Sequence, residues 1–156
     1  MGFFSFLFQK PVFIDDPVFG RLRRESFDKR TGKAGFITED LKFASTGPPI
    51  GCYLNTLGAG PTAAQRAFYR RIEEKYAELV PKLIPIIEDE FRNWKPKFQI
   101  RDFATEFWLT AISIPELDHT QKVAWNWSFE TIHDDNHMLT IYMHDETPEP
   151  GLQMDG

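Results

Sequence analysis

Apolar residues recur at helical spacing over one long stretch in the middle of the chain. Between residues 64 and 94 they are separated by steps of three and four, which places them on one face of a helix. Thr62 and Gln65, at the start of this stretch, have the spacing of a capping box, and Pro96 follows its end. The pattern predicts a long amphipathic helix whose apolar face carries Ala64, Phe68, Ile72, Tyr76, Leu79, Leu83, Ile87, Phe91 and Trp94.

Two prolines, Pro81 and Pro85, lie within this helical stretch near its polar face. Each proline removes a backbone hydrogen bond and bends a helix. Helices that curve around a core already have longer hydrogen bonds on their solvent side, where a proline disturbs them least. We therefore expect one long bent helix, with a pair of helices broken near Pro81 as the alternative.

Shorter apolar runs on both sides of the helix have the length and composition of β-strands. Clusters of Gly, Pro, Asn and Asp separate them, as turns do between strands. The expected strands cover residues 18–27, 34–43, 52–57, 106–114, 123–132 and 138–143, with a single helical turn at 101–105. The expected fold class is α+β: an antiparallel sheet of about six strands, in the order meander, long helix, meander, packed on one long bent helix.

The last two expected strands form a hairpin whose register decides where two histidines lie. If the three residues before His137 form the loop, His133 pairs with His137 and Trp127 pairs with Met143. Asn136 then takes the left-handed conformation that closes a type I turn with a bulge. A slip of one residue would exchange the core and solvent faces, so burial favours this register. It exposes Glu130 and gathers on the core face Trp125, Trp127, Phe129, Leu139, Ile141 and Met143.

Composition predicts one folded domain, residues 1–156. The chain is 42% hydrophobic and 15% aromatic, which is enough apolar surface for a packed core and argues against disorder. Its one cysteine, Cys52, excludes an intramolecular disulfide framework and a cysteine-rich zinc module. The sequence lacks an apolar run of the roughly 20 residues that a membrane-spanning helix needs. We therefore expect no membrane partner.

The first eleven residues are expected to form an N-terminal arm. Residues 1–8 contain four phenylalanines, but basic residues do not precede them and a small-residue cleavage site does not follow. The segment therefore differs from a signal peptide, and a cytoplasmic location follows by default. The alternative use of the arm is a contact between copies of the chain, made through Phe3, Phe4, Phe6 and Phe8.

Acidic residues accumulate toward the end of the chain, which has a formal net charge of −5. Lys122 is the last basic residue, and seven acids follow it: Glu130, Asp134, Asp135, Asp145, Glu146, Glu149 and Asp155. Such a surface repels the phosphates of nucleic acids and attracts a basic protein. We therefore expect a basic protein partner and no nucleic acid. The alternative is an acidic tail, residues 145–156, that only keeps the chain soluble.

The densest polar cluster is His133-Asp134-Asp135-Asn136-His137, in the final hairpin. Opposed across a hairpin, its two imidazoles could share a zinc ion with a neighbouring carboxylate. Aspartate and asparagine are also common turn residues without any metal. We expect no catalytic residue, metal or cofactor, because the serines lack the Gly-x-Ser-x-Gly turn of a hydrolase nucleophile. The expected partner-binding residues are Glu130, His133, Asp134, Asp135, His137, Asp145 and Glu146.

Two local motifs carry a resemblance to known proteins. One is Asp16-Pro17-Val18-Phe19-Gly20, and the other is Gly60-Pro61-Thr62-x-x-Gln65-Arg66 at the start of the helix. With Trp94 and the hairpin over residues 127–141, they resemble a group of small uncharacterised bacterial α+β proteins over most of the chain. In size and style the chain is also similar to bacterial toxin-immunity proteins. The resemblance implies a fold and no activity, because its motifs are turns, a cap and core aromatics.

Together these features predict a cytoplasmic protein-binding domain, similar to an immunity protein, that is not an enzyme. Its acidic C-terminal hairpin would engage the basic partner. The alternative is a small metal-dependent or histidine-based hydrolase that uses the region of His133 and His137. A third alternative is a purely structural subunit, joined to its neighbours through the phenylalanine-rich arm.

Overall fold

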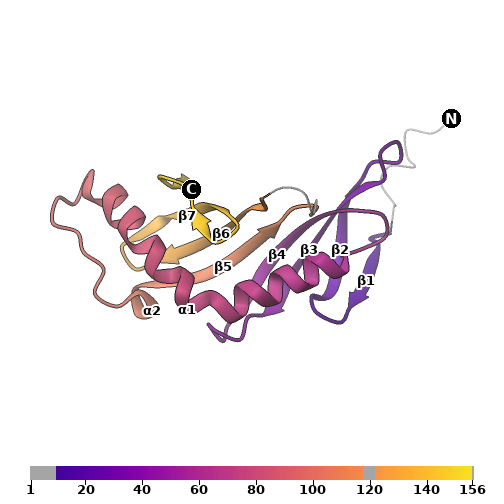
Figure 1. Cartoon of the computed structure of the whole chain (residues 1–156), viewed down its shortest axis with the longest axis horizontal. Coiled ribbons are helices and arrows are strands. Elements are labelled where there is room, and N and C mark those ends of the chain that lie inside the picture. The colour runs from indigo at the N-terminus through magenta and orange to yellow at the C-terminus, as the bar shows by residue number, and fades with distance from the viewer. Residues whose placement is uncertain (1–9, 118–121, 156) are drawn as a thin grey trace.

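The computed structural model describes residues 10–117 and 122–155. Nine strands and two helices occupy these ranges (Figure 1). Before the long helix α1 (Ala63–Arg92) the chain forms β1 (Phe13–Asp16), β2 (Gly20–Phe27), β3 (Lys33–Lys42) and β4 (Pro49–Leu57). After α1 follow α2 (Phe103–Glu106), β5 (Phe107–Ile114), β6 (Ala124–Thr131), β7 (Asp134–His144), β8 (Thr147–Pro148) and β9 (Gln153–Asp155).

The nine strands form one sheet in the order β1-β2-β3-β4-β5-β6-β7-β8, with β9 also paired to β7. The expectation of about six antiparallel strands is therefore wrong in two respects, although the broader α+β class is right. The additional strands β1, β8 and β9 have two to four residues each, too few for a periodic pattern to reveal. In addition, β4 and β5 are parallel, because α1 carries the chain back from the end of β4 to the start of β5.

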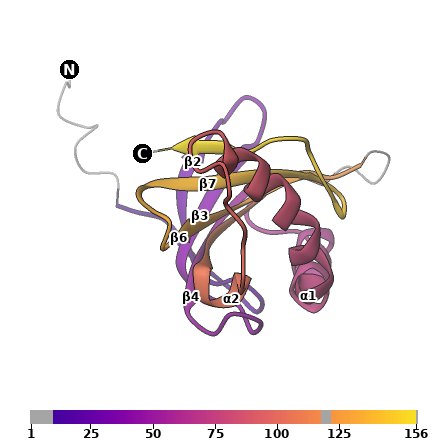
Figure 2. The ribbon, with the colours of Figure 1, turned by 90° about the vertical axis from the view of Figure 1, so that its left-hand side faces the viewer.

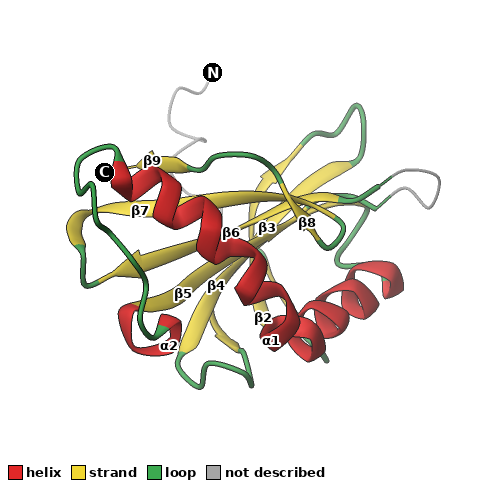
Figure 3. Ribbon diagram, turned by 60° about the vertical axis from the view of Figure 1, so that its left-hand side comes forward, coloured by secondary structure: helices red, strands yellow, loops and turns green. Residues whose placement is uncertain are grey.

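α1 is a single helix of 30 residues that bends as it crosses the sheet (Figure 3). Pro81 and Pro85 both lie inside it, so the alternative of two separate helices is wrong. Both prolines are exposed, which puts their missing hydrogen bonds on the outer side of the bend. The predicted capping box is present: Thr62 Oγ1 accepts from Gln65 N at 3.2 Å, and Gln65 Oε1 accepts from Thr62 N at 3.0 Å.

Asp16 ties the turn between β1 and β2 to the first turn of α1. Its Oδ1 accepts hydrogen bonds from the backbone N–H groups of Val18 and Phe19, at 2.9 and 3.0 Å. Its Oδ2 accepts from Arg66 Nε and Nη2, at 2.9 and 2.7 Å. Burial alone would raise the pKa of Asp16, but these hydrogen bonds, the Arg66 bonds foremost, lower it. The two motifs singled out in the sequence therefore contact each other and hold α1 against the sheet.

Gln65, which is fully buried, has a second structural task besides the cap. Its Nε2 donates to the carbonyl oxygens of Asn55 and Pro115, at 2.7 and 2.9 Å. One carbonyl lies in β4 and the other lies just after β5. The side chain therefore joins the start of α1 to both of the strands that α1 connects.

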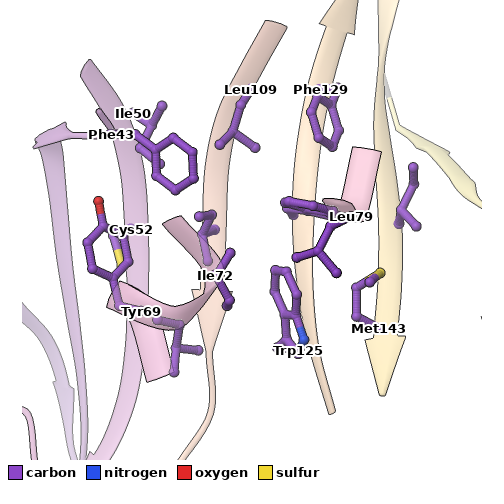
Figure 4. Packing of buried hydrophobic residues seen from close by; sticks show 14 of the residues in the cluster. Phe43, Ile50, Cys52, Tyr69, Ile72, Leu79, Leu109, Trp125, Phe129 and Met143 are labelled. Atoms are coloured by element: carbon purple, nitrogen blue, oxygen red, sulfur yellow. The ribbon is translucent and has the colours of Figure 1, made fainter. Parts of the chain in front are cut away.

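The hydrophobic core lies between α1 and one face of the sheet (Figure 4). α1 contributes the apolar face that its periodicity predicts, except that Trp94 lies beyond the helix and is exposed. The sheet contributes alternate residues of each strand, because successive side chains point to opposite faces. The six residues assigned to the core face of the last hairpin are all buried: Trp125, Trp127, Phe129, Leu139, Ile141 and Met143.

The last hairpin has the predicted faces but not the predicted register. Trp127 pairs with Ile141, whereas the sequence analysis paired it with Met143. The difference is two residues along β7. Because side chains alternate with a period of two, this shift leaves every residue on the same face. The burial pattern therefore excludes registers shifted by one residue, which would exchange the two faces. It cannot distinguish registers that differ by two residues.

The turn of this hairpin is also shorter than expected. Thr131 pairs with Asp134, so the turn consists of Ile132 and His133, and a bulge follows in β7. Asp134 Oδ1 accepts from Asn136 N at 3.0 Å, and this local bond shapes the bulge. Asn136 is not left-handed, since Asp145 is the one non-glycine residue of the described chain with a positive φ. The predicted pairing of His133 with His137 is therefore wrong.

The segment after β7 belongs to the sheet. β8 and β9 both pair with β7, so the described part of the expected acidic tail, residues 145–155, packs on the domain. Of the expected arm, residues 10 and 11 are described, whereas Phe3, Phe4, Phe6 and Phe8 lie outside the described residues. Among the helices that the structure describes, none has the length and apolar character needed to span a bilayer.

Candidate functional site

One face of the sheet packs on α1 (Figure 2). The opposite face, called the uncovered face below, carries mostly small and polar side chains on its central strands. Strand alternation places these residues between the core residues of each strand. Ser128 and Thr140 lie next to each other on this face, with their hydroxyl oxygens 3.0 Å apart, so one hydroxyl donates to the other. The central strands β4, β5 and β6 contribute Gly51, Tyr53, Ala111, Ser113, Asn126 and Ser128.

β4 and β5 separate at their N-terminal ends and leave a cleft between them. Their parallel ladder pairs only Gly51–Leu54 with Ala111–Ile114. The first two residues of β4 and the first four residues of β5, Phe107–Thr110, extend beyond this ladder. A cavity of about 720 Å³ occupies the cleft. Its size falls within the range of ligand pockets, roughly 300–1,000 Å³.

The walls of this cavity are mainly apolar and aromatic. Tyr76 of α1 and Phe107 line its inner end, next to the core. Tyr53 and Trp108 line its outer side and are 49% and 42% exposed. Among the described residues that line the cavity, Glu39 alone carries a charge. The cavity therefore offers an apolar interior with an aromatic entrance.

A second cavity of about 280 Å³ adjoins the first, because Trp108 and Met138 line both. Trp108 Nε1 donates a hydrogen bond to Glu130 Oε2 at 2.9 Å, which holds the indole at the junction. We call the two cavities together the groove. The other residues of the second cavity come from the end of β6, the start of β7 and the end of β9: Thr131, Asp134, Asp135, Asn136, His137 and Asp155.

The second cavity is acidic. Four carboxylates line it: Glu130, Asp134, Asp135 and Asp155. The described lining of the two cavities contains no Lys or Arg. His137 Nδ1 lies 2.9 Å from Asp134 Oδ2. The backbone hydrogen bond from Asn136 and the contact with His137 lower the pKa of Asp134, so this carboxyl stays ionised. The groove thus combines an apolar end with an anionic end.

His133, in contrast, lines neither cavity. Its Nε2 lies 2.7 Å from Glu106 Oε2, and its ring packs edge-on against Phe98, with the ring centres 4.8 Å apart. Lys95 Nζ donates to the His133 carbonyl oxygen at 2.8 Å. These contacts anchor the β6–β7 turn to α2 and to the segment after α1. We therefore interpret His133 as a structural residue.

The carboxylate that holds His133 is itself buried and well supplied with donors. Glu106 Oε1 accepts from the backbone N–H groups of Arg101 and Asp102, at 2.8 and 2.6 Å. Burial by itself would raise the pKa of Glu106. The hydrogen bonds from Asp102, His133 and Arg101 outweigh it and lower the pKa. Glu106 therefore remains ionised at neutral pH and organises three segments around its two oxygens.

The structure separates the two histidines chemically, because each contacts a different carboxylate. In the described ranges, His, Cys, Asp and Glu form no group of three that could hold a metal ion.

Cys52 is fully buried, and its burial raises the pKa of the thiol far above the usual value. A thiolate nucleophile is therefore disfavoured at this position.

Two of the expected binding residues, Asp145 and Glu146, lie beyond the opposite end of β7 from the groove. Asp145 Oδ1 accepts from Val123 N at 3.0 Å, and its backbone oxygen accepts from Trp125 Nε1 at 2.7 Å. Glu146 contacts Lys75 of α1 at 2.8 Å, and its pKa is lowered mainly by that bond. The expected acidic surface is therefore divided: Asp145 and Glu146 lie at one end of β7, and Glu130, Asp134, Asp135 and Asp155 line the groove.

Three residues of the groove were not singled out from the sequence: Glu39, Tyr53 and Trp108. Each lies in a predicted strand and was assigned no role beyond the sheet. The alternation of side chains along a strand could have identified Trp108. It lies between the buried Phe107 and Leu109 and therefore points to the opposite face of the sheet. A tryptophan on the solvent side of a strand is a candidate contact residue. The cleft itself has no local signal, since it depends on how two distant strands meet.

No family model matches the sequence, and comparisons with curated proteins and with solved structures give no match. The resemblance to small bacterial α+β proteins therefore stays a prediction. The function has to be inferred from the chemistry of the groove and of the surfaces beside it.

Proposed function

We propose that this chain is a protein-binding domain that engages a basic partner through the groove. The observation that carries the proposal is the continuity of the two cavities at Trp108 and Met138. One end of the groove accepts apolar side chains and the other end accepts positive charge. A protein segment with both kinds of side chain fits such a surface, because interfaces combine a hydrophobic centre with a polar rim.

The exposed aromatic residues support this proposal. Tyr53, Trp108 and Tyr142 lie on the uncovered face and are all exposed. Tyrosine and tryptophan dominate the residues whose truncation weakens protein interfaces. Single exposed apolar residues are ordinary, but Tyr53 and Trp108 both line one cavity, with Tyr142 on the same face, and form a surface suited to a partner.

The charge distribution supports a basic partner. Lys75 of α1 donates to the Glu146 carboxylate and offsets its charge, and Lys82 donates to the Glu146 backbone carbonyl oxygen. The acids at the groove end have no such cations: Asp135 and Asp155 are exposed and lack a described ion pair. Their field would accelerate association with a basic protein and would be screened by salt.

A binding role accounts for the described side chains better than the hydrolase alternative. His133 packs into the protein against Glu106, and His137 contacts Asp134. In the hydrogen bonds that the structure describes, the two imidazole rings contact carboxylates and no hydroxyl or thiol. We include in the proposal a cytoplasmic location and a mode of action similar to that of an immunity protein, which acts by occupying its partner.

The proposal is tested by affinity capture from the native host with three baits. The first bait is the wild-type chain, and the second carries Glu130→Gln and Asp135→Asn. The third carries Glu74→Gln and Glu78→Gln, which remove the same charge from exposed positions of α1. In the second bait, the amide oxygen introduced at position 130 can still accept the Trp108 N–H, so the geometry of the groove is retained.

We expect a basic protein on the wild-type and α1 baits at about 50 mM salt, and its loss from the groove bait. Raising the salt concentration to about 300 mM should release it from the wild-type and α1 baits, because electrostatic attraction is screened. Equal capture by all three baits, or a captured partner that is acidic, would contradict the proposal.

A further inference from the structure

The strand edge that lines the cleft has unused pairing capacity. β5 pairs with β6 along most of its length, including Phe107 and Leu109. On its other side, the ladder to β4 begins only at Ala111. The Phe107 N–H donates to the Phe103 carbonyl oxygen of α2. Trp108 directs its backbone groups to β6, because the antiparallel ladder bonds alternate residues. The Phe107 carbonyl and the backbone groups of Leu109 therefore face β4 without a strand partner in the described sheet. An unpaired strand edge is a template for another extended chain.

The cleft has room for that chain. Gly51 lies where β4 and β5 part: a Cβ on it would be 3.5 Å from both Ala111 Cβ and the Thr110 carbonyl oxygen. Beyond this point the loop before β4 and the start of β5 form opposite walls of the 720 Å³ cavity. The open end of the cleft faces solvent on the uncovered side of the sheet, next to Tyr53 and Trp108.

We propose that an extended segment of the basic partner enters this cleft and pairs with the Phe107–Thr110 edge of β5. The inference rests on the proposed function and specifies how the partner is recognised. Addition of a strand to an exposed edge is a general mode of peptide recognition, in which backbone bonds supply affinity and alternate side chains supply specificity. The cleft provides both kinds of contact: the edge of β5 offers backbone groups for pairing, and the cavity beside it accepts side chains.

The two sides of the cleft define the sequence of the segment. Side chains that point inward meet the apolar walls made by Tyr76, Phe107 and Ile112. Side chains that point outward meet Glu39, and those beyond Trp108 meet Glu130. An extended segment presents alternate residues to the two sides. The segment should therefore alternate apolar residues with Lys or Arg.

The experiment uses a displayed library of random twelve-residue peptides, selected on the full chain. Wild-type protein, Gly51→Phe and Asn55→Phe are compared. A phenyl ring at position 51 would fill the cleft, whereas Asn55 lies on the same strand and face but outside the cavity. The selected peptide is then synthesised, and amide hydrogen exchange is measured on the wild-type chain with and without it.

We expect enriched peptides that alternate apolar and basic residues, at least tenfold weaker binding to Gly51→Phe, and unchanged binding to Asn55→Phe. The amide of Leu109, which faces the cleft, should exchange at least tenfold more slowly in the complex, whereas the amide of Phe107, already bonded to Phe103, should change little. Peptide binding without that protection would overturn strand addition while leaving the proposed function intact. Acidic or non-alternating peptides would overturn it as well. If Gly51→Phe fails to fold, the exchange measurement on the wild-type chain decides.

Discussion

Trp108 and Glu130 form a cross-strand pair on the uncovered face of the sheet, and the indole N–H donates to the carboxylate at 2.9 Å. The bond fixes a large aromatic ring between an apolar cavity and an acidic one. It also occupies one oxygen of Glu130 and leaves the negative charge at the surface. This single pair therefore connects the two kinds of chemistry on which the proposed binding function depends.

Replacement of Trp108 by alanine should weaken binding of the captured partner by at least tenfold. Truncation of a central aromatic contact typically costs about 2 kcal/mol or more of binding free energy. The free energy of unfolding should change much less, since the side chain is partly solvated in the free domain. Titration calorimetry gives the first quantity and urea denaturation the second. A loss of stability with unchanged affinity would show that Trp108 is only structural.

Replacement of Glu106 by glutamine should lower the free energy of unfolding by about 2 kcal/mol at pH 7, because charged hydrogen bonds become neutral ones. Hydrogen bonds outweigh burial and lower the pKa of Glu106 in the folded chain. Its stabilising contribution is therefore complete above the ordinary glutamate pKa and disappears as the pH falls through the lowered value. Urea denaturation between pH 7 and pH 3 should show the wild type and the variant converging. A constant difference over that range would contradict this account of Glu106.

Replacement of Asp16 by alanine should destabilise the domain by about 3 kcal/mol, near the lower end for loss of a partner from a buried ion pair. The carboxylate is almost wholly buried, whereas Arg66 remains partly exposed and can be rehydrated. Asp16→Asn should cost less, because the amide oxygen can still accept from the backbone of the turn. Denaturant midpoints of the two variants test this order, and an equal loss for both would contradict it.

Gln65→Ala should destabilise the domain more than Thr62→Ala does. Loss of the threonine cap removes one local bond and typically costs about 1 kcal/mol. Loss of Gln65 also leaves two buried carbonyl oxygens, of Asn55 and Pro115, without their donor. We expect a total near 3 kcal/mol from these unsatisfied groups. Chemical denaturation of both variants measures the difference, and a larger effect at Thr62 would show that the link between strands matters little.

The long helix was predictable from the sequence because its determinants are local. Helical periodicity, a capping box and terminal breakers all lie within one continuous stretch. The same reasoning recovered the core face of the last hairpin, since alternation assigns faces without a partner strand. It could not assign the register, because a shift of two residues buries the same side chains.

The candidate site was less accessible to sequence reasoning because it depends on contacts between distant segments. Trp108 and Glu130 are 22 residues apart, and Glu106 and His133 are 27 residues apart. The His133–His137 spacing left a shared site open as the alternative, but Glu106 and Asp134 each hold one of the two histidines. The groove itself exists because β4 and β5 pair over only part of their length, and neither strand shows this alone.

The location of the partner on the uncovered face can be measured directly by site-specific photo-crosslinking in the native host. Benzoylphenylalanine in place of Tyr53 puts the reactive group at the mouth of the cleft, and the same residue in place of Glu78 puts it on the exposed side of α1. The account predicts that one basic protein is cross-linked from position 53 and is absent from position 78. Cross-linking of the partner from position 78, with none from position 53, would contradict it.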